Sequence, residues 1–434
     1  MDNIVDVLII GSGVAGLYCA LNLRKDLNIL VVSKSKLESS NTYLAQGGIA
    51  TARNEEDKPF FVQDTLRAGH YKNDIKAVEI LADESMENID ELIGLGVEFD
   101  KEGKDLSFTK EGAHSINRIV HTKDYTGKSV AQALIKEALL RDNIRIFEDS
   151  YFVDIIEDKG KCTGAIVIKD NMQINIYAKA VVLATGGIGG LFNNSTNQRI
   201  LKGDGIATAI KHKIKLKDID YIQIHPTAFY EENVDDKRLL ISEAIRGEGG
   251  KLINSKGERF VDEILPRDVV SKAIFEEMKK DEKPYVNLDI RFLGEEYIKN
   301  RFSFIYRECL KKGTDITKDY IKVSPAQHYF MGGIEVDVDS KTSMRNLYAV
   351  GEVSCTGVHG ANRLASTSLL EGLVFSKRAA IDINNIIHYN KVKTVRVSNL
   401  NESIEELSIR NERMVIGALR ERCKDLDYEL FNCR

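Results

Sequence analysis

The chain has 434 residues, 43% of them hydrophobic and 29% charged, which is an ordinary composition for a globular protein of two or three domains. Its formal net charge is −5 with both signs interspersed, so charge gives no reason to expect nucleic acid or an anionic membrane as a partner. The six cysteines form neither a CxxC pair nor a zinc-site spacing, which favours reduced thiols in a cytoplasmic protein without a metal.

The N-terminal segment predicts a strand, a glycine-rich turn and a helix. Residues 4–10 are an apolar run rich in β-branched residues, residues 17–24 continue with helical spacing, and residues 28–33 predict a second strand. This order is typical of a parallel sheet with helices on its faces. Because the N-terminus is acidic, and Asp6 and three glycines interrupt the apolar stretch, we expect neither a signal peptide nor a membrane span.

The residues that follow extend this α/β pattern. Amphipathic helices are predicted at 74–95 and 128–140, and the second leads to a strand at 144–148. The remaining predictions are an antiparallel β excursion at 151–156, 162–168 and 173–178, a separate buried strand at 180–185, and a short helix at 205–212.

A change of pattern at about residue 219 predicts a second domain. Strands and glycine turns there are followed by helices at 268–280 and 294–311. A strand at 346–350 and a helix from about 367 then resume the first pattern, and residues 401–422 predict a charged amphipathic helix. We therefore expect an α/β fold with a Rossmann-like domain at 1–218 and 330–395, an inserted α+β domain at 219–329, and a short helical segment at 396–434.

The sequence Gly11-x-Gly13-x-x-Gly16 follows the first predicted strand and opens a helix. Gly11 permits a tight turn, Gly13 lets the backbone approach a pyrophosphate, and Gly16 allows the helix to pack closely on the strand. The helix N-terminus offers free N–H groups to phosphates. This context predicts a dinucleotide site rather than a plain βα turn. The second strand ends in Ser33-Lys34 instead of an acid, which weakens an assignment to NAD.

Further strand ends favour FAD as the dinucleotide. Ala184-Thr185-Gly186 ends a late strand, Gly203-Asp204-Gly205 precedes a helix, and Glu352 follows the last strand. FAD is long, so several strand ends must meet it, and a carboxylate at Glu352 is placed to bind ribitol hydroxyls. Each motif alone could be an ordinary turn, but their order along one chain favours FAD.

Additional motifs follow one another in a fixed order. They are Ala45-Gln46-Gly47-Gly48, His225-Pro226-Thr227, Glu243, Arg246-Gly247-Glu248-Gly249, Pro266-Arg267-Asp268, His328-Tyr329, Gly332-Gly333 and Gly360-Ala361-Asn362-Arg363-Leu364-Ala365. With the glycine turn, they make the chain from residue 4 to about 385 similar to the flavoprotein family of fumarate reductases, succinate dehydrogenases and L-aspartate oxidases. The resemblance implies an FAD domain and a mobile capping domain at about 219–329. It also implies a fuller C-terminal helical bundle than the single helix predicted after residue 400.

The resemblance also implies how FAD is held. Many family members attach FAD covalently through a His just before the AQGG string, where this chain has Asn41, so we expect noncovalent FAD. The expected contacts are Gly11, Ser12, Gly13, Val14, Ala15, Gly16, Lys34, Asn41, Thr42, Ala45, Gln46, Gly47, Gly48, Phe152, Ala184, Thr185, Gly186, Asp204, Glu352, Ser368 and Leu369.

Glu111 bears on the choice of substrate within the family. The segment Lys110-Glu111-Gly112-Ala113-His114-Ser115 looks like the aspartate oxidase version of a loop near the substrate. A carboxylate there would repel a plain dicarboxylate and would attract an α-ammonium group. The alternative is a solvated Glu on the surface.

The family motifs also suggest which residues grip the two carboxylates. Arg363 suits a bidentate contact, and His225, His328 and Ser242 can add hydrogen bonds. Without the motifs, each histidine would more often be an ordinary core or surface residue.

In similar proteins the residue at the position of Arg267 handles the substrate proton. Because a free guanidinium has a pKa above 12, such a role requires a relay, for which Glu243 and Arg246 are the candidates, with Gln223 as a neighbour. The alternative is a structural ion pair of Arg267 with Asp268 or Glu263.

The resemblance implies oxidation of L-aspartate to iminoaspartate, with oxygen or fumarate as electron acceptor. It also implies a place in NAD synthesis, where quinolinate synthase consumes the imine. A soluble fumarate reductase, which would have no use for Glu111, and a flavoprotein subunit docked on an iron–sulfur partner are the alternatives.

Overall fold

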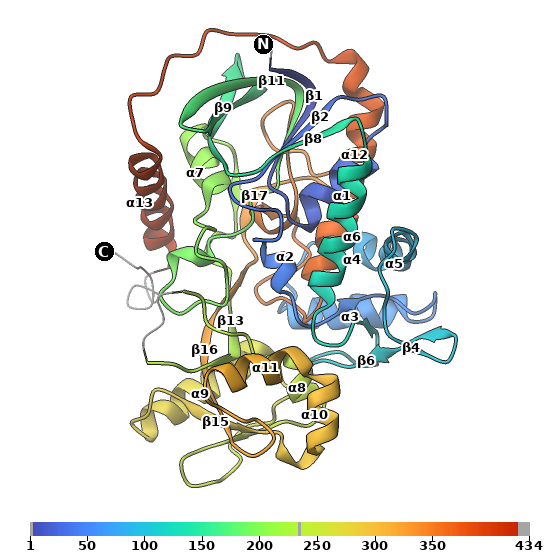
Figure 1. The fold of residues 1–434 in the computed structure, drawn as a ribbon, viewed down its shortest axis with the longest axis vertical. Coiled ribbons are helices and arrows are strands. Elements are labelled where there is room, and N and C mark those ends of the chain that lie inside the picture. Colours follow the sequence, from blue (N-terminus) through green and yellow to red (C-terminus); the bar gives the residue numbers. More distant parts are fainter. Residues whose placement is uncertain (1–2, 233–235, 424–434) are drawn as a thin grey trace.

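The computed structural model describes residues 3–232 and 236–423, and its largest element is a seven-stranded sheet (Figure 1). The strand order is β8-β2-β1-β11-β10-β9, and β18 also pairs with β11. Pairs among β8, β2, β1, β11 and β18 are parallel, whereas β9, β10 and the first half of β11 are antiparallel. The strands are β1 (Ile4–Ile10), β2 (Ile29–Val32), β8 (Ile144–Phe147), β9 (Ser150–Asp158), β10 (Lys161–Lys169), β11 (Met172–Leu183) and β18 (Leu347–Ala349).

The prediction of separate strands at 173–178 and 180–185 is wrong, because β11 runs unbroken from Met172 to Leu183. Its twelve residues contain no glycine or proline that would interrupt the ladder. Lys179, at the predicted break, pairs with Asp6 of β1 at 2.7 Å. One edge of β11 pairs first with β10 and then with β18, so a single strand joins the antiparallel excursion to the parallel sheet.

Helices cover both faces of this sheet, as predicted for an α/β fold. Val7 and Ile9 point into a core with α1 (Val14–Asn22), α6 (Thr126–Leu140) and α12 (Ser368–Ile386), whereas Leu8 and Ile10 face the opposite core. That second core contains α7 (Asp204–Lys211) and α13 (Ile404–Arg422), which pack together. The alternation follows from the two-residue period of a strand.

Two predicted helices are divided in the structure. The helix expected at 74–95 is α4 (Ile75–Asp83) and α5 (Ser85–Gly94), and the one expected at 294–311 is α10 (Glu295–Arg301) and α11 (Ser303–Lys311). At the first break the Ser85 hydroxyl bonds Ala52 N, and at the second Phe302 is fully buried in a core. Tertiary contacts therefore override a continuous helical pattern.

A four-stranded antiparallel sheet in the order β13-β16-β15-β14 lies at the lower end in Figure 1. It packs with α8–α11 around a core of its own, and we propose that these elements form the capping domain. Its further elements are β13 (Ile222–Phe229), α8 (Glu243–Gly247), β14 (Lys251–Ile253), α9 (Arg267–Lys280), β15 (Val286–Asp289) and β16 (Ile321–Phe330).

The remaining α-helices and strands of the described chain are mostly short. They are α2 (Asn41–Leu44), β3 (Ile49–Ala50), α3 (Lys58–Ala68), β4 (Lys101–Glu102), β5 (Asp105–Leu106), β6 (Phe108–Thr109), β7 (Ile119–Val120), β12 (Leu216–Lys217), β17 (Gly333–Glu335) and β19 (Ser354–Cys355).

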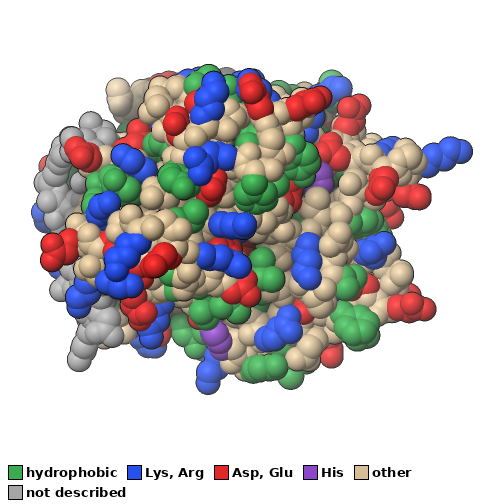
Figure 2. Space-filling view, turned by 90° about the horizontal axis from the view of Figure 1, so that it is seen from below, with side chains coloured by type: hydrophobic (Ala, Val, Ile, Leu, Met, Phe, Trp, Pro, Cys, Tyr) green, Lys and Arg blue, Asp and Glu red, His purple; other side chains and the backbone are tan. Residues whose placement is uncertain are grey.

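The surface of the described chain is mixed in charge (Figure 2), and its cysteines are free thiols. Seen from the capping end, acidic and basic side chains are interspersed with hydrophobic ones (Figure 2). Cys19, Cys162, Cys309, Cys355 and Cys423 are buried free thiols, and the remaining cysteine, at position 433, lies outside the described residues. Within 3–232 and 236–423, no helix could cross a membrane and no His, Cys, Asp and Glu side chains cluster as metal ligands.

Candidate active site

One long cavity connects the carboxyl ends of the parallel strands with the capping elements. All the predicted catalytic residues line it, as do all the predicted cofactor contacts except Gly16. Gly16 lies behind the cavity, where a Cβ would come within 2.0 Å of the Gly11 carbonyl oxygen. Its place in the motif is therefore explained by helix–strand packing.

The glycine turn forms one end of the cavity and is built by backbone approach. Gly11 has φ +120°, and a Cβ there would lie 2.0 Å from the Ala184 carbonyl oxygen at the end of β11. At Gly13, by contrast, a Cβ would meet only the Thr42 hydroxyl at 3.4 Å, so this position faces open space. The Thr42 hydroxyl also accepts a 3.0 Å bond from Val14 N and joins α2 to the turn.

The end of β2 receives a carboxylate from another part of the chain. Lys34 Nζ lies 3.0 Å from Asp204 in the first turn of α7, and both residues line the cavity. The Ser33 and Ser12 hydroxyls are hydrogen-bonded at 2.8 Å. A carboxylate therefore lies beside the end of β2, although the strand itself is followed by Ser33-Lys34.

Several polar groups along this half of the cavity fit a ligand that carries hydroxyls and amides. Gln46 Oε1 and Thr185 Oγ1 are buried without a hydrogen-bond partner in the described structure. Glu352 accepts a 3.0 Å bond from Phe330 N, and its enclosure raises the pKa of its carboxyl to about 7. Buried polar groups normally have partners, so these residues fit the flavin and ribitol of FAD.

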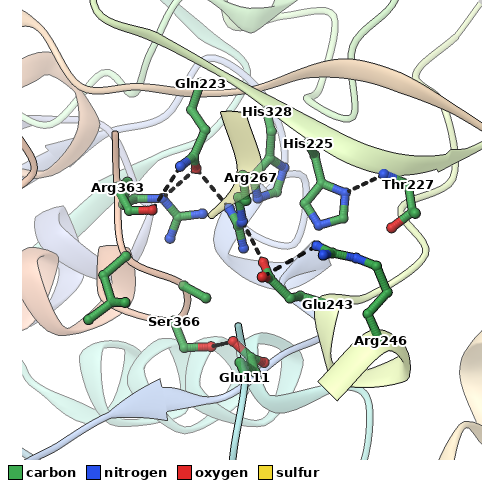
Figure 3. Close-up of polar contacts among 12 residues, drawn as sticks. Glu111, Gln223, His225, Thr227, Glu243, Arg246, Arg267, His328, Arg363 and Ser366 are labelled. Carbon is green, nitrogen blue, oxygen red and sulfur yellow. Dashed lines mark hydrogen bonds and ion pairs between the residues drawn. The ribbon is translucent and has the colours of Figure 1, made fainter. Parts of the chain in front are cut away.

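The other half of the cavity is built from charged side chains (Figure 3). Arg363 is only 4% exposed, stacks over the Tyr329 ring at 4.6 Å, and donates to Gln223 Oε1 and the Ser368 hydroxyl. Burial and the charge of Arg267 lower the pKa of Arg363 to about 10, which leaves it cationic at neutral pH. An orientated, poorly hydrated guanidinium of this kind suits a bidentate carboxylate contact.

Arg267 is the first residue of α9 and points into the same space. It donates to Glu243 at 2.5 Å and to Gln223 Oε1 at 2.7 Å. The alternative of an ion pair with Asp268 or Glu263 is wrong. Asp268 pairs with His70, and Glu263 pairs with Arg259.

Glu243 links Arg267 to a second arginine. Arg246 lies 3.3 Å from the other Glu243 oxygen and donates to the Glu263 backbone carbonyl. Although burial opposes it, the charges of Arg267 and Arg246 keep the pKa of Glu243 below its ordinary value. The carboxylate therefore stays ionised between two guanidinium groups.

The two histidines lie edge to face, with ring centroids 5.0 Å apart. Burial, followed by the charge of Arg267, keeps the pKa of each ring well below its usual value. His225 Nδ1 accepts a 3.1 Å bond from Thr227 N, so the neutral ring carries its proton on Nε2. His328 Nδ1 is bonded to the Thr196 hydroxyl at 2.8 Å. Both rings are thus orientated neutral hydrogen-bonding groups.

Glu111 brings a second buried carboxylate to this cationic region. It is 3% exposed, so the alternative of a solvated surface residue is wrong. Burial, followed by the Glu243 carboxylate, raises the pKa of Glu111, and a bond from Ser366 and the charges of Arg267 and Arg363 partly offset this. An anionic group of this kind can bind an ammonium ion.

Thr196, Asn197 and Ser366 are among the cavity-lining residues that sequence reasoning did not single out. Thr196 and Asn197 reach the cavity from a loop after β11. Asn197 donates to the His328 carbonyl and accepts a hydrogen bond from the Asn41 side-chain amide. Ser366 lies directly after the Gly360–Ala365 motif, which could have suggested it. The loop residues carry no local sequence signal.

Comparison with known proteins agrees with this geometry. Residues 6–369 match the FAD binding domain family. The chain is 54% identical to L-aspartate oxidase of Clostridium perfringens, covering 100% of this chain and 98% of that protein, and 58% identical to the same enzyme of Clostridium acetobutylicum, covering 90% of each. A variant of the FrdA chain of E. coli quinol fumarate reductase is 30% identical with a TM-score of 0.83, covering 98% of this chain and 74% of that one.

Proposed function

Because this chain belongs to the L-aspartate oxidase family of FAD-binding proteins, we propose that it oxidises L-aspartate to iminoaspartate. L-Aspartate loses its Cα hydrogen with the bonding electron pair and one proton from nitrogen, which leaves a protonated C=N group. FAD held along the glycine turn and Glu352 would supply the acceptor for that hydrogen and its electron pair, and oxygen or fumarate would then take up the electrons.

The side chains around the cavity determine which molecules fit. Arg363 binds one carboxylate through its guanidinium, and the Nε2–H of His225 donates to a carboxylate oxygen. His328 adds a hydrogen-bonding ring on the same wall. Neutral rings orientate the substrate without adding positive charge, which leaves the arginines to supply the electrostatic attraction.

The observation that carries the proposal is the buried Glu111 carboxylate. It lies in a cavity otherwise suited to two carboxylates, and its charge would disfavour a substrate without a cation. The α-ammonium group of L-aspartate supplies that cation. Succinate and fumarate do not.

Arg267, Glu243 and Arg246 form the proposed route for the substrate proton. A guanidinium cannot store an extra proton, but it can receive one at one nitrogen while releasing another from Nε to Glu243. Arg246, on the far side of Glu243, continues the route. Arg267 and Glu243 are already in contact, so little rearrangement is needed.

We propose that FAD is held noncovalently. The Asn41 amide cannot form the bond that a histidine forms, and it is engaged with Asn197 and with Gln198 N at 3.0 Å. Acid precipitation of the purified protein should release the flavin into the supernatant. Flavin fluorescence that stays with the precipitated polypeptide would contradict this.

The instability of an imine in water suggests the next step. We propose that quinolinate synthase consumes iminoaspartate in NAD synthesis, and membership of the L-aspartate oxidase family supports this.

We also propose that the protein acts in the cytoplasm, and the same family membership supports this.

The proposed function is tested by steady-state turnover of the FAD-loaded protein in air. Hydrogen peroxide and ammonia should appear with L-aspartate in a one-to-one ratio, and neither should appear with succinate. Turnover of succinate, or none of L-aspartate, would contradict the proposal.

A further inference from the structure

Ser366 has an unusual backbone conformation next to the substrate end of the cavity. Its φ is +58°, in the left-handed region where a side chain is strained and glycine is favoured. The backbone is fixed there because Ser366 O accepts a 2.8 Å bond from Ala50 N. A serine in a place that suits glycine indicates that its hydroxyl is used.

The hydroxyl forms a directed chain of hydrogen bonds. Gly48 N donates to Ser366 Oγ at 3.3 Å, and Ser366 Oγ donates to Glu111 Oε2 at 2.6 Å. A backbone amide can only donate, so the Ser366 oxygen accepts from Gly48. The hydroxyl proton is then free to point to the Glu111 carboxylate. Bonds to an ionised acceptor are stronger than neutral ones, and this one holds Glu111 in a single orientation.

The other Glu111 oxygen packs against the backbone of the same loop. A Cβ at Gly47 would lie 2.9 Å from Glu111 Oε1 and 3.2 Å from Ser366 Oγ. A Cβ at Gly112, the residue after Glu111, would lie 2.4 Å from Glu243 Oε1, so Glu243 packs against the backbone beside Glu111. The Glu111 carboxylate therefore lies against the Gly47-Gly48 loop, with the Ser366 hydroxyl as its donor.

We propose that Ser366 is a positioning residue for recognition of the substrate ammonium group. Its hydroxyl orientates Glu111 and favours the ionised form, although Ser366 itself does not touch the reacting atoms. The inference rests on the proposed function, since only an amino dicarboxylate needs the Glu111 charge. Oxidation of L-aspartate should depend on Ser366, and binding of fumarate or succinate should not.

The electrostatic surroundings of Glu111 predict a pH signature. Glu243 disfavours its charge, whereas Arg246, Arg267 and Arg363 favour it. Removing the Ser366 bond takes away one contribution that lowers the Glu111 pKa. The pKa then rises, and the acid limb of kcat/KM for L-aspartate moves to higher pH.

The experiment compares Ser366→Gly, Glu111→Gln and the double variant with the wild-type holoenzyme. Ser366→Gly removes the hydroxyl and suits the left-handed backbone. Ser366→Ala is a second variant that removes the same hydroxyl but keeps the Cβ. Ser340→Gly is the matched control, because Ser340 also has a positive φ of 63° but bonds the Phe375 carbonyl away from the cavity. Succinate affinity is measured from the flavin spectrum, which does not depend on turnover.

We expect Ser366→Gly to raise KM for L-aspartate roughly tenfold or more, with a smaller change in kcat, since hydrogen bonds to charged groups are stronger than neutral ones. Succinate affinity and fumarate-dependent reoxidation should stay within about twofold, and Ser366→Gly should add no further loss to Glu111→Gln.

Equal losses for L-aspartate and succinate, additive effects in the double variant, or wild-type kinetics of Ser366→Gly would overturn the role of Ser366. If the wild-type protein does not oxidise L-aspartate, the proposed function fails first, and this inference fails with it.

Discussion

The two ends of the cavity are built in different ways. The flavin end is formed by the glycine turn and several strand ends, and much of its shape comes from backbone without side chains, as at Gly11 and Gly13. The substrate end uses single charged side chains from distant segments, such as Glu111, Arg267 and Arg363. The shape of the backbone therefore determines which cofactor fits, whereas a balance of buried charges determines which substrate fits.

The balance of charge at the substrate end follows from five side chains, which form the charged cluster. The guanidinium groups of Arg246, Arg267 and Arg363 face the carboxylates of Glu111 and Glu243, which leaves one net positive charge while both histidines are neutral. L-Aspartate carries one net negative charge and neutralises the cluster. Fumarate carries two and neutralises it only when Glu111 is protonated.

The largest effect is expected at the flavin end, where Gly11→Ala places a Cβ 2.0 Å from a backbone oxygen at a positive φ. We expect destabilisation by at least about 3 kcal/mol and little folded protein. Gly13→Ala has room in the protein and should fold, but should bind FAD much more weakly. Thermal unfolding and flavin content measure both. A stable, FAD-loaded Gly11→Ala protein would contradict this view of the turn.

The next effect concerns the proton route at the substrate end. Arg267→Gln keeps a donor near Glu243 but removes the guanidinium, and we expect kcat to fall roughly a hundredfold to ten-thousandfold. FAD content should remain normal, because Arg267 lies among the capping elements. The check is stopped-flow reduction of the flavin by L-aspartate. Reduction within tenfold of the wild-type rate would exclude Arg267 from the route.

Glu111→Gln tests the charge balance itself. We expect kcat/KM for L-aspartate to fall about tenfold to a hundredfold, because a buried charged contact is lost. Fumarate should be reduced at least as well as by the wild-type protein, since a repelling charge is removed. Parallel losses with both substrates would show that Glu111 has only a structural role.

The smallest effect is a difference in pH dependence between the two substrates. Because burial and Glu243 raise the Glu111 pKa, its ionised form is lost at a higher pH than for an ordinary glutamate. The kcat/KM for L-aspartate should therefore fall as pH drops through that raised pKa. Succinate affinity should be retained or increase over the same interval. The test is titration of flavin spectra at several pH values, and identical profiles would contradict it.

The flavin end could be predicted largely from local sequence. The strands predicted at 4–10 and 28–33 and the glycine turn between them follow from hydrophobic period and turn residues. The errors arose where tertiary contacts act, as in the continuous strand β11 and the helix breaks at Glu84 and Phe302. A single sequence has no local signal for such contacts.

Sequence motifs suggested which residues line the substrate end. The hydrogen bonds and ion pairs between those residues became known only from the structure. Glu111 and Ser366 are separated by 255 positions, and no spacing rule joins them. The partners of Arg267 were likewise open between Glu243, Asp268 and Glu263 until the fold placed Glu243 beside it. Long-range packing, rather than residue type, determines those contacts.

The most direct test of the account is anaerobic mixing of the FAD-loaded protein with L-aspartate, followed by flavin absorbance near 450 nm. We expect bleaching by L-aspartate and not by succinate, and return of the oxidised spectrum when fumarate is added. A flavin that stays oxidised with L-aspartate, while the dithionite-reduced protein is rapidly reoxidised by fumarate, would identify a fumarate reductase and contradict the central claim.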